Sequence, residues 1–380
     1  MDLRELREEM DRIDSGIVRL YAERMETARR IGRYKKEHNL PVTDTERERE
    51  TLNRVAREAG ETNEGGIRSL FGVLIAQSRM DQLMEGREPG ETGKRIRQSL
   101  EETPQLFPEK AKVACQGVEG AYSQQACEKI FRYPSITYYR TFENVFSAIE
   151  NGECRYGVLP IENSLAGSVN SVYDLLTSRK CFIVRSARVK IGHTLLAPRG
   201  VRMEDIREVW SHEQAISQCS AFLAENRQWQ VNIATNTAAA AQMVARSGRK
   251  DVAAISSFRC AAQYGLEILQ GDIQNNSNNH TRFICISRRP EIYPGADRTS
   301  LVLALPHRPG ALYRLLGRFH AQGINLTKLE SRPVPGRDFE FMFCVDIDAS
   351  VYSPSFIRLM EELDVMLEEM TYLGSYSEVV

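Results

Sequence analysis

Apolar residues recur every three or four positions at the start of the chain, and this rhythm predicts one face of a helix. The series is Leu3, Leu6, Met10, Ile13, Ile17 and Leu20. Helical character continues to about residue 38, which gives a helix about 55 Å long at about 1.5 Å per residue. Such a helix is longer than a small domain is wide. We therefore expect it to pack against a second copy of itself.

The face that this rhythm predicts to be buried turns polar part-way along. Its next position is Arg24, and Lys35 lies three helical turns further on the same face. A later predicted helix carries an apolar stripe over 67–75 that continues through Ser78 and Gln82. A charge on a buried face costs several kcal/mol unless it is paired. These positions therefore need either solvent or a polar partner.

Two interpretations fit these polar positions. The solvated ends of a helical bundle would account for Arg24 alone. The set also includes Asp44, Arg47 and Glu48 within one turn of the helix between them, where Asp44 is a candidate N-cap. Several cations beside neutral donors favour a pocket for a small dicarboxylate, because guanidinium groups bind carboxylates through paired hydrogen bonds.

The rest of the chain changes texture twice. Residues 86–110 mix Gly, Pro and charge without periodicity and are expected to be a linker. Residues 111–287 alternate short β-rich runs with helical stretches, which predicts an α/β domain with a largely parallel sheet. After a Pro/Gly break, we expect strand 299–305, helix 309–322, strands 324–332 and 338–348, helix 353–370 and strand 371–379. This order is a βαββαβ unit.

Composition narrows the class of protein. A chain of 380 residues exceeds the roughly 250–300 at which single cores stop growing, so several domains are expected. The formal net charge of −1 argues against nucleic acid or an acidic membrane as a partner. The chain has no signal-peptide pattern and no long apolar run. The eight cysteines are scattered singly, which indicates free thiols in the cytoplasm and no metal site.

The helical segment resembles the all-helical chorismate mutases at the N-terminus of bifunctional phenylalanine-biosynthesis enzymes. All eight family positions are filled as that family fills them: Arg7, Arg24, Lys35, Asp44, Arg47, Glu48, Ser78 and Gln82. The resemblance implies that Arg7 and Arg24 hold the two carboxylates of chorismate. It also implies that Lys35 and Gln82 face the ether oxygen and Glu48 the hydroxyl. The rearrangement is intramolecular, so catalysis requires a held conformer and positive charge beside the ether oxygen.

Five motifs make the middle segment similar to the prephenate dehydratase family, which has two α/β lobes with the active site between them. They are "QGVEGAYS", "PIENSLAGSV", "WSHEQAISQC", "TNTAAAA" and "NHTRFICIS". The family's signature threonine is Thr281. The resemblance places Glu162, Asn163, Ser164, Ser211, His212, Gln214, Thr235, Arg282 and Phe283 beside the substrate. For His212, capping the following helix is an equal alternative.

The dehydratase reaction loses carbon dioxide and the ring hydroxyl together. The departing hydroxyl needs a proton, which Thr281 would supply or relay, with Glu162 as the alternative acid. Val118 and Ala121 stand where many family members have Pro and Ser, and Glu213 stands where many have Pro. These departures affect the expected substrate preference more than the expected activity.

The last segment resembles a regulatory ACT domain that binds phenylalanine. "RPGALYRLL" places Gly310 at a strand-to-helix turn, and "NLTKLESRP" carries a Glu-Ser-Arg-Pro motif. Without a Cβ, glycine lets backbone N–H groups approach a carboxylate. The phenylalanine-binding residues implied by the resemblance are Gly310, Ala311, Leu312, Asn325, Glu330 and Ser331.

We therefore expect an all-α mutase domain over 1–85, a linker over 86–110, a two-lobed α/β dehydratase domain over 111–288 and a ferredoxin-like α+β ACT domain over 298–380. The expected protein is a cytoplasmic, cofactor-free homodimer or higher oligomer that makes phenylpyruvate and is inhibited by phenylalanine. Two alternatives stay open. The dehydratase could prefer arogenate, or the folds could serve a non-catalytic sensor of small acids.

Overall fold

The computed structural model describes residues 2–334 and 341–379. Contacts divide the chain into two compact units. One unit contains Met1–Glu91 and Arg358–Met366, and the other contains Thr92–Ile357 and Leu367–Val380. Residues 338–340 of the strand expected over 338–348 lie outside the described residues.

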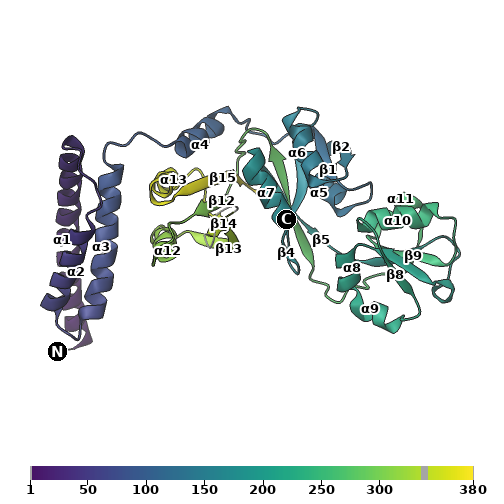
Figure 1. Ribbon diagram of the computed structural model, residues 1–380, viewed down its shortest axis with the longest axis horizontal. Coiled ribbons are helices and arrows are strands. Elements are labelled where there is room, and N and C mark those ends of the chain that lie inside the picture. Colours follow the sequence, from purple (N-terminus) through teal and green to yellow (C-terminus); the bar gives the residue numbers. More distant parts are fainter. Residues whose placement is uncertain (1, 335–340, 380) are drawn as a thin grey trace. The chain divides into compact units, whose positions relative to one another are not determined.

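Three helices form the N-terminal part of the first unit (Figure 1): α1 (Leu3–Glu37), α2 (Thr45–Ala59) and α3 (Glu64–Met84). Asp2 caps α1 in a capping box with Glu5. Asp44 caps α2 by accepting a 3.0 Å hydrogen bond from the Arg47 N–H, so the predicted cap is confirmed. The predicted length of the first helix is confirmed as well.

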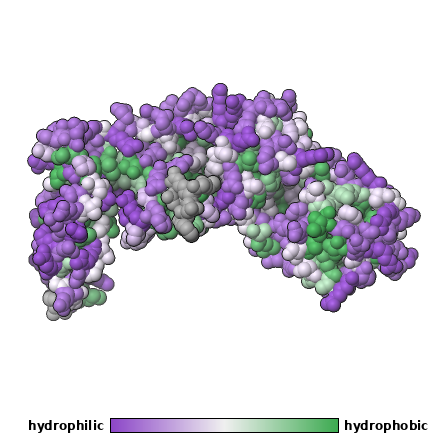
Figure 2. All heavy atoms as spheres, in the orientation of Figure 1, coloured by the Kyte–Doolittle hydropathy of each residue, from purple (hydrophilic) through white to green (hydrophobic). Residues whose placement is uncertain are grey.

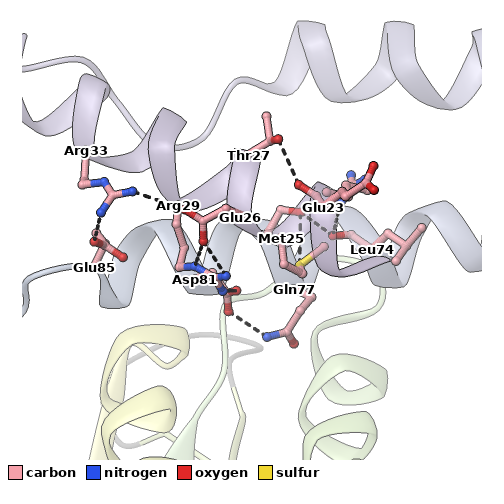
Figure 3. A network of polar contacts seen from close by, with 12 residues as sticks. Glu23, Met25, Glu26, Thr27, Arg29, Arg33, Leu74, Gln77, Asp81 and Glu85 are labelled. Carbon is pink, nitrogen blue, oxygen red and sulfur yellow. Dashed lines mark hydrogen bonds and ion pairs between the residues drawn. The ribbon is translucent and has the colours of Figure 1, made fainter. Parts of the chain in front are cut away.

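Helices α1 and α3 are joined by a close backbone approach and by polar contacts (Figure 3). A Cβ on Gly32 of α1 would lie 3.0 Å from the Gln82 Cα of α3, so glycine is what allows this approach. Arg29 pairs with Glu26 of its own helix at 2.8 Å and with Asp81 of α3 at 3.4 Å. Partly exposed pairs of this kind contribute little stability. The close packing at Gly32 therefore does more to hold the two helices.

The apolar stripe of α1 stays exposed over its first twenty residues. Leu3, Met10 and Leu20 keep 64, 57 and 60% of their surface accessible. Burial on α1 begins only at Met25, followed by Ala28 and Gly32. Half of this helix therefore offers apolar surface that the described residues of its own chain do not cover.

The segment 86–110, expected to be a linker, is partly helical, which its lack of periodicity did not predict. This segment contains helix α4 (Glu91–Glu102), which buries Gly93, Ile96 and Ser99 at a spacing of three residues. After the helix, the Thr103 hydroxyl oxygen accepts a 3.0 Å hydrogen bond from the Ile292 N–H. Charged residues dominate the segment, and its single fully buried apolar position, Ile96, gave too little periodicity to predict a helix.

The second unit contains two α/β lobes (Figure 1). The first lobe has a seven-stranded sheet in the order β16-β5-β11-β3-β1-β2, with β4 paired to β3. Its strands are β1 (Lys110–Gln116), β2 (Tyr133–Tyr139), β3 (Tyr156–Asn163), β4 (Gly167–Ser168), β5 (Phe182–Lys190), β11 (His280–Ser287) and β16 (Glu378–Val379). Helices α5 (Tyr122–Ile130), α6 (Phe142–Glu150) and α7 (Asn170–Arg179) complete it.

The second lobe has a five-stranded sheet in the order β10-β6-β9-β7-β8. Its strands are β6 (Thr194–Ala197), β7 (Glu208–Ser211), β8 (Gln230–Ile233), β9 (Val252–Ser256) and β10 (Glu267–Gln270). Its helices are η1 (Met203–Asp205), α8 (Glu213–Gln218), α9 (Ser220–Glu225), α10 (Thr237–Arg246) and α11 (Arg259–Tyr264). Figure 2 shows apolar side chains gathered on one face of this lobe. The exposed apolar residues of the lobe include Val231 and Ile233 of β8.

Both sheets are mixed, so the prediction of a largely parallel sheet is wrong. Strand β11 is antiparallel to β3 and to β5, and β6 is antiparallel to β9 and to β10. The chain enters the second lobe between β5 and β6 and returns between β10 and β11. These two crossings place returning strands beside outgoing ones, a feature that the local β-pattern does not encode.

The C-terminal segment has the predicted βαββαβ order: β12 (Arg298–Ala304), α12 (Ala311–Ala321), β13 (Asn325–Pro333), β14 (Phe341–Asp348), α13 (Pro354–Met366) and β15 (Glu369–Tyr376). Its sheet has the order β13-β14-β12-β15 and is antiparallel. One apolar core joins this sheet to the first lobe, since it contains Val302, Cys344 and Leu373 together with Ile284 and Ile286 of β11.

All eight cysteines are free and buried, as expected. Among the described residues, no helix combines the length and the apolar character needed to cross a membrane. The described residues also contain no group of three or more His, Cys, Asp or Glu side chains arranged to hold a metal ion.

Gly374 provides a test of the contact between β15 and β5. Its φ is +142°, and a Cβ there would lie 2.1 Å from the Ile183 carbonyl oxygen. Gly374→Ala should destabilise the second unit by about 1–3 kcal/mol because the backbone must shift, and thermal unfolding should show it. The control is Gly317→Ala in α12, where a Cβ meets nothing within 4 Å. An equal melting temperature for both variants would contradict this packing.

Candidate active sites

A cavity of about 590 Å³ lies in the helical unit and is lined by residues of α1, α2 and α3. Seven of the eight predicted residues line it: Arg24, Lys35, Asp44, Arg47, Glu48, Ser78 and Gln82. The exception is Arg7, which lies seventeen residues before Arg24 on α1. That separation corresponds to about 26 Å along the helix axis.

Arg24 is tied to α3 at the wall of this cavity. Its guanidinium donates to the Leu74 carbonyl oxygen at 2.9 Å and also to the Ser78 hydroxyl. Burial lowers the pKa of Arg24, which means that the site is partly shielded from water and that the charge is costly there. An anion entering the cavity would offset that cost.

Other polar groups of the cavity have some of their hydrogen bonds within the unit, and one has none. Lys35 Nζ donates to the Val42 carbonyl oxygen at 2.8 Å, and Glu48 accepts from Arg79 at 2.9 Å. The Gln82 side-chain oxygen is buried without a hydrogen-bond partner. A buried unpaired polar atom is costly, so the amide of Gln82 is available to a ligand.

Arg79 lines this cavity too, and it was not predicted. It follows Ser78 directly, off the apolar stripe that indicated Ser78 and Gln82. Its position beside Glu48 depends on how α2 packs on α3. Periodicity within one helix carries no signal for such a contact.

In the second unit, Thr281 lies opposite Asn163 in the register of β11 and β3. Asn163 Nδ2 donates to the Thr281 hydroxyl oxygen at 2.9 Å, and both residues are only 8% exposed. The Asn163 side-chain oxygen accepts from the N–H groups of Leu165 and Ala166, each at 3.0 Å. The amide orientation is therefore set by its surroundings. Because Thr281 accepts from Asn163, its own O–H is left to donate to another group.

A chain of hydrogen bonds continues from Asn163 across the segments that join the two lobes. Asn163 donates to Asn279 at 2.7 Å, and Asn279 donates to the Gln218 side-chain oxygen at 3.0 Å. His193 Nε2 contacts the same oxygen at 2.8 Å, and burial lowers the pKa of His193. Asn279, Gln218 and His193 were not predicted, although the first two fall within quoted motifs. They come from three separated segments, which only the fold brings together.

Ser164 also lies beside this pair, where its hydroxyl oxygen accepts a 3.0 Å hydrogen bond from the His280 N–H. His212 caps α8, with its ring nitrogen accepting from the Gln214 N–H at 3.3 Å. The capping alternative for His212 is therefore the one that the geometry favours. Thr235 is exposed at the end of the loop before α10.

Four of the predicted substrate-binding residues face elsewhere. Phe283 is 3% exposed and packs in the core beneath α5. Ser211 is fully buried and donates to the Ile255 carbonyl oxygen at 2.7 Å. Glu162 and Arg282 form an ion pair at 3.0 Å and contact the C-terminal sheet. Alternation along β11 turns Arg282 to the face opposite Thr281, whereas Phe283 shares the face of Thr281 and is taken up by core packing.

In the C-terminal segment, Gly310 has φ +76° and begins α12, as the turn motif predicted. Ala311 is buried and Leu312 half-buried, whereas Asn325 and Ser331 lie at exposed positions of β13. Glu330 has contacts that its motif did not predict. Its carboxylate contacts Lys328 at 3.0 Å and Ser168 of the first lobe, so it lies against the first lobe.

Two protein-family models match the chain: chorismate mutase type II over residues 6–83 and prephenate dehydratase over residues 113–291. A bifunctional chorismate mutase/prephenate dehydratase of Aquifex aeolicus is 32% identical over 381 residues, covering 100% of this chain and 99% of the relative. An Arabidopsis thaliana arogenate dehydratase/prephenate dehydratase 1, chloroplastic, is 39% identical and covers 70% of this chain and 72% of the relative. A prephenate dehydratase from Arthrobacter aurescens, solved in complex with L-Phe, has a TM-score of 0.63 at 30% identity. The match covers 70% of this chain and 89% of the Arthrobacter chain.

Proposed function

The chain belongs to the family of bifunctional chorismate mutase/prephenate dehydratases, and on this basis we propose how its residues divide two reactions of phenylalanine biosynthesis. It rearranges chorismate to prephenate and then converts prephenate to phenylpyruvate. This assignment of the two reactions to different residues rests on one observation: each segment that matches a family model has its own polar site. One is the cavity of the helical unit, and the other is the Asn163–Thr281 pair of the second unit.

The mutase reaction needs no nucleophile, because the bonds break and form within one molecule. We assign Arg24 to a carboxylate of chorismate, with Lys35 and Gln82 at the ether oxygen, where negative charge develops. Both line the same cavity. The Gln82 side-chain oxygen has no partner, so a flip of the amide that turns its NH2 group toward the ether oxygen breaks no hydrogen bond of that oxygen. Glu48 is assigned to the ring hydroxyl, with Asp44, Arg47 and Ser78 as further binding residues.

The dehydratase reaction removes carbon dioxide and the ring hydroxyl in one elimination. We assign Thr281 as the group that donates a proton to the departing hydroxyl. Asn163 donates to the Thr281 oxygen, which directs the threonine O–H toward the substrate side. Ser164 and Thr235 of the loop before α10 supply neutral donors. Such donors avoid gripping the carboxylate whose charge disperses as it leaves.

A second copy of the chain completes the mutase site in this proposal. Arg7 is too far along α1 to reach a small dicarboxylate that contacts Arg24 of the same chain. The exposed apolar stripe of α1 would be covered by an antiparallel α1 of a partner. Two-fold symmetry then brings the partner's arginine to this cavity and returns Arg7 to the partner's cavity.

The C-terminal segment is proposed to be an ACT domain that binds phenylalanine and slows the dehydratase. Its βαββαβ order and the left-handed Gly310 at the start of α12 support this, as does the relative solved with L-Phe. We keep the domain boundaries proposed from the sequence, 1–85, 111–288 and 298–380, with α4 in the connecting segment. The eight free thiols support a reducing compartment, and we propose the cytoplasm.

Arogenate is the alternative substrate for the dehydratase, and one specific observation favours considering it. The Arabidopsis relative carries both arogenate and prephenate dehydratase in its name. Arogenate differs from prephenate in an amino group that replaces a keto oxygen. Val118 and Ala121, which depart from the common family pattern, lie at the turn before α5 and are the positions where such a preference would be sought.

The two activities should separate by mutation. Lys35→Ala should lower mutase activity by at least about 100-fold, because it removes charge from the developing ether oxygen, and should leave dehydratase activity on supplied prephenate unchanged. Thr281→Ala should do the reverse. Lys36→Ala is the matched control, since Lys36 contacts the Gly86 carbonyl oxygen outside the cavity. Loss of both activities in either folded variant would contradict the assignment.

Shared mutase sites predict complementation between inactive chains. After dissociation and reassociation of an equal mixture of Arg7→Ala and Lys35→Ala, mutase activity should return to about a quarter of the wild-type value. Half of the dimers are mixed, and two-fold symmetry gives each mixed dimer one intact site. Assays of each variant reassociated alone provide the baseline. Mixtures that form heterodimers and stay inactive would place Arg7 outside the site.

Phenylalanine should bind the full chain in a calorimetric titration and slow prephenate turnover. Gly310→Ala should weaken that binding about tenfold, because alanine is strained at this positive φ. Gly317→Ala, within the helix that Gly310 precedes, is the control and should bind as the wild type does. A wild-type chain that gives no heat of binding with L-phenylalanine would contradict the regulatory assignment.

A further inference from the structure

A cluster of charged side chains lies between the strands that carry Asn163 and Thr281 and the C-terminal sheet. Arg282 of β11 contacts Asp346 of β14 at 2.5 Å and Glu162 of β3 at 3.0 Å. The side chains of Arg282 and Asp346 are only 9 and 2% exposed. Ser300 of β12 donates to the other Asp346 oxygen at 2.6 Å. The C-terminal sheet therefore holds the guanidinium of Arg282, the residue that follows Thr281 in the chain.

The second half of the cluster centres on Lys328 of β13, whose side chain is 7% exposed. Lys328 contacts Glu162 at 3.2 Å and Glu330 at 3.0 Å, and it donates to the Ser168 hydroxyl. Lys328 also lies directly opposite Asp346 in the register of β13 and β14. Glu162 thus contacts one cation from its own sheet and one from the C-terminal sheet.

This cluster is a costly way to join two domains. Burial alone would lower the pKa of Arg282, but neighbouring Tyr376 and Asp346 raise it overall. Burial would likewise raise the pKa of Glu330, but Ser168 and Lys328 lower it. The charges of Arg282 and Glu330 are therefore stabilised by their partners. Apolar residues could close the same junction at least as well, so the ionic form points to a role beyond stability.

The position of Glu162 links the cluster to the catalytic pair. The register between β11 and β3 is irregular here, because Arg282 pairs with Glu162 and Phe283 pairs with Pro160, which leaves Ile161 as an extra residue. Such bulges re-aim neighbouring side chains and often lie beside active sites. Asn163, which orients Thr281, is the residue next to Glu162. A shift of Glu162 would therefore move the group that directs the threonine hydroxyl.

We propose that this cluster of Glu162, Arg282, Lys328, Glu330 and Asp346 couples the state of the C-terminal sheet to the dehydratase site. The proposal rests on the assignment of phenylalanine to the C-terminal segment. Strand β13 carries the expected phenylalanine-binding positions Asn325 and Ser331 as well as Lys328. Movement of β13 on ligand binding changes the contact of Lys328 with Glu162, and the bulge passes that change to Asn163. A ligand shifts such an equilibrium only through contacts that differ between the two states.

The test measures phenylalanine binding and dehydratase inhibition in the same full-length variants. Lys328→Met removes the charge and keeps most of the side-chain length, whereas Lys328→Arg keeps the charge. We expect Lys328→Met to bind phenylalanine within about threefold of the wild type, while the ratio of uninhibited to inhibited rate falls at least about fivefold, the lower end of typical coupling. Lys328→Arg should retain most of the inhibition.

Asp174→Asn is the matched control. Asp174 of α7 pairs with Arg332 of β13 at 2.7 Å, so it joins the same two domains through an ion pair that does not involve β3 or β11. Phenylalanine should inhibit this variant as strongly as the wild type. Glu162→Gln removes the same contact from the dehydratase side, so the C-terminal sheet keeps its own residues. The inhibited rate of each variant is divided by the uninhibited rate of the same variant. Folded Lys328→Met and Glu162→Gln variants that bind phenylalanine and are fully inhibited would overturn the coupling role. A wild-type chain that binds no phenylalanine would instead overturn the assignment of phenylalanine binding to the C-terminal segment, on which the proposal rests.

Discussion

Side chains alternate between the two faces of β11, and this constraint determines what each part of the second unit does. Thr281, Phe283 and Cys285 share one face, where Phe283 and Cys285 pack with α5. Arg282, Ile284 and Ile286 share the other, where Ile284 and Ile286 join the core that includes the C-terminal sheet. A single strand thus presents a hydroxyl to one side and a buried cation to the other. The pairing of β11 with β3 gives each of them a partner, Asn163 for Thr281 and Glu162 for Arg282.

The helical unit depends on a different constraint, the length of α1. A helix of 35 residues is longer than its own short bundle can cover, so its first half stays exposed and its Arg7 stays remote from the cavity. The same excess length lets one helix serve two sites if a partner lies antiparallel to it. Dimer formation and completion of the mutase site then follow from one feature, because the apolar stripe and Arg7 occupy the same half of α1.

The sequence predicted the features that depend on local pattern. Helix length, the Asp44 cap, the C-terminal element order and seven residues of the helical cavity all follow from periodicity and short motifs. It failed where distant segments meet. Helix α4 was not predicted because it has a single buried apolar residue, Ile96, among many charged ones. The antiparallel position of β11 was not predicted because it depends on the two places where the chain crosses between the lobes. Arg282 and Phe283 were expected beside the substrate as motif neighbours of Thr281, yet the strand turns Arg282 to the opposite face and core packing takes Phe283. Gln218 and His193 meet Asn279 only in the folded lobes.

The central claim is that one chain carries both reactions at separate sites. A time course with purified protein and chorismate as the only substrate tests it most directly, with chorismate, prephenate and phenylpyruvate quantified in each sample. The account predicts that chorismate falls, prephenate rises and then declines, and phenylpyruvate accumulates to match the chorismate consumed. Persistence of chorismate, or prephenate that accumulates without enzymatic conversion to phenylpyruvate, would contradict it.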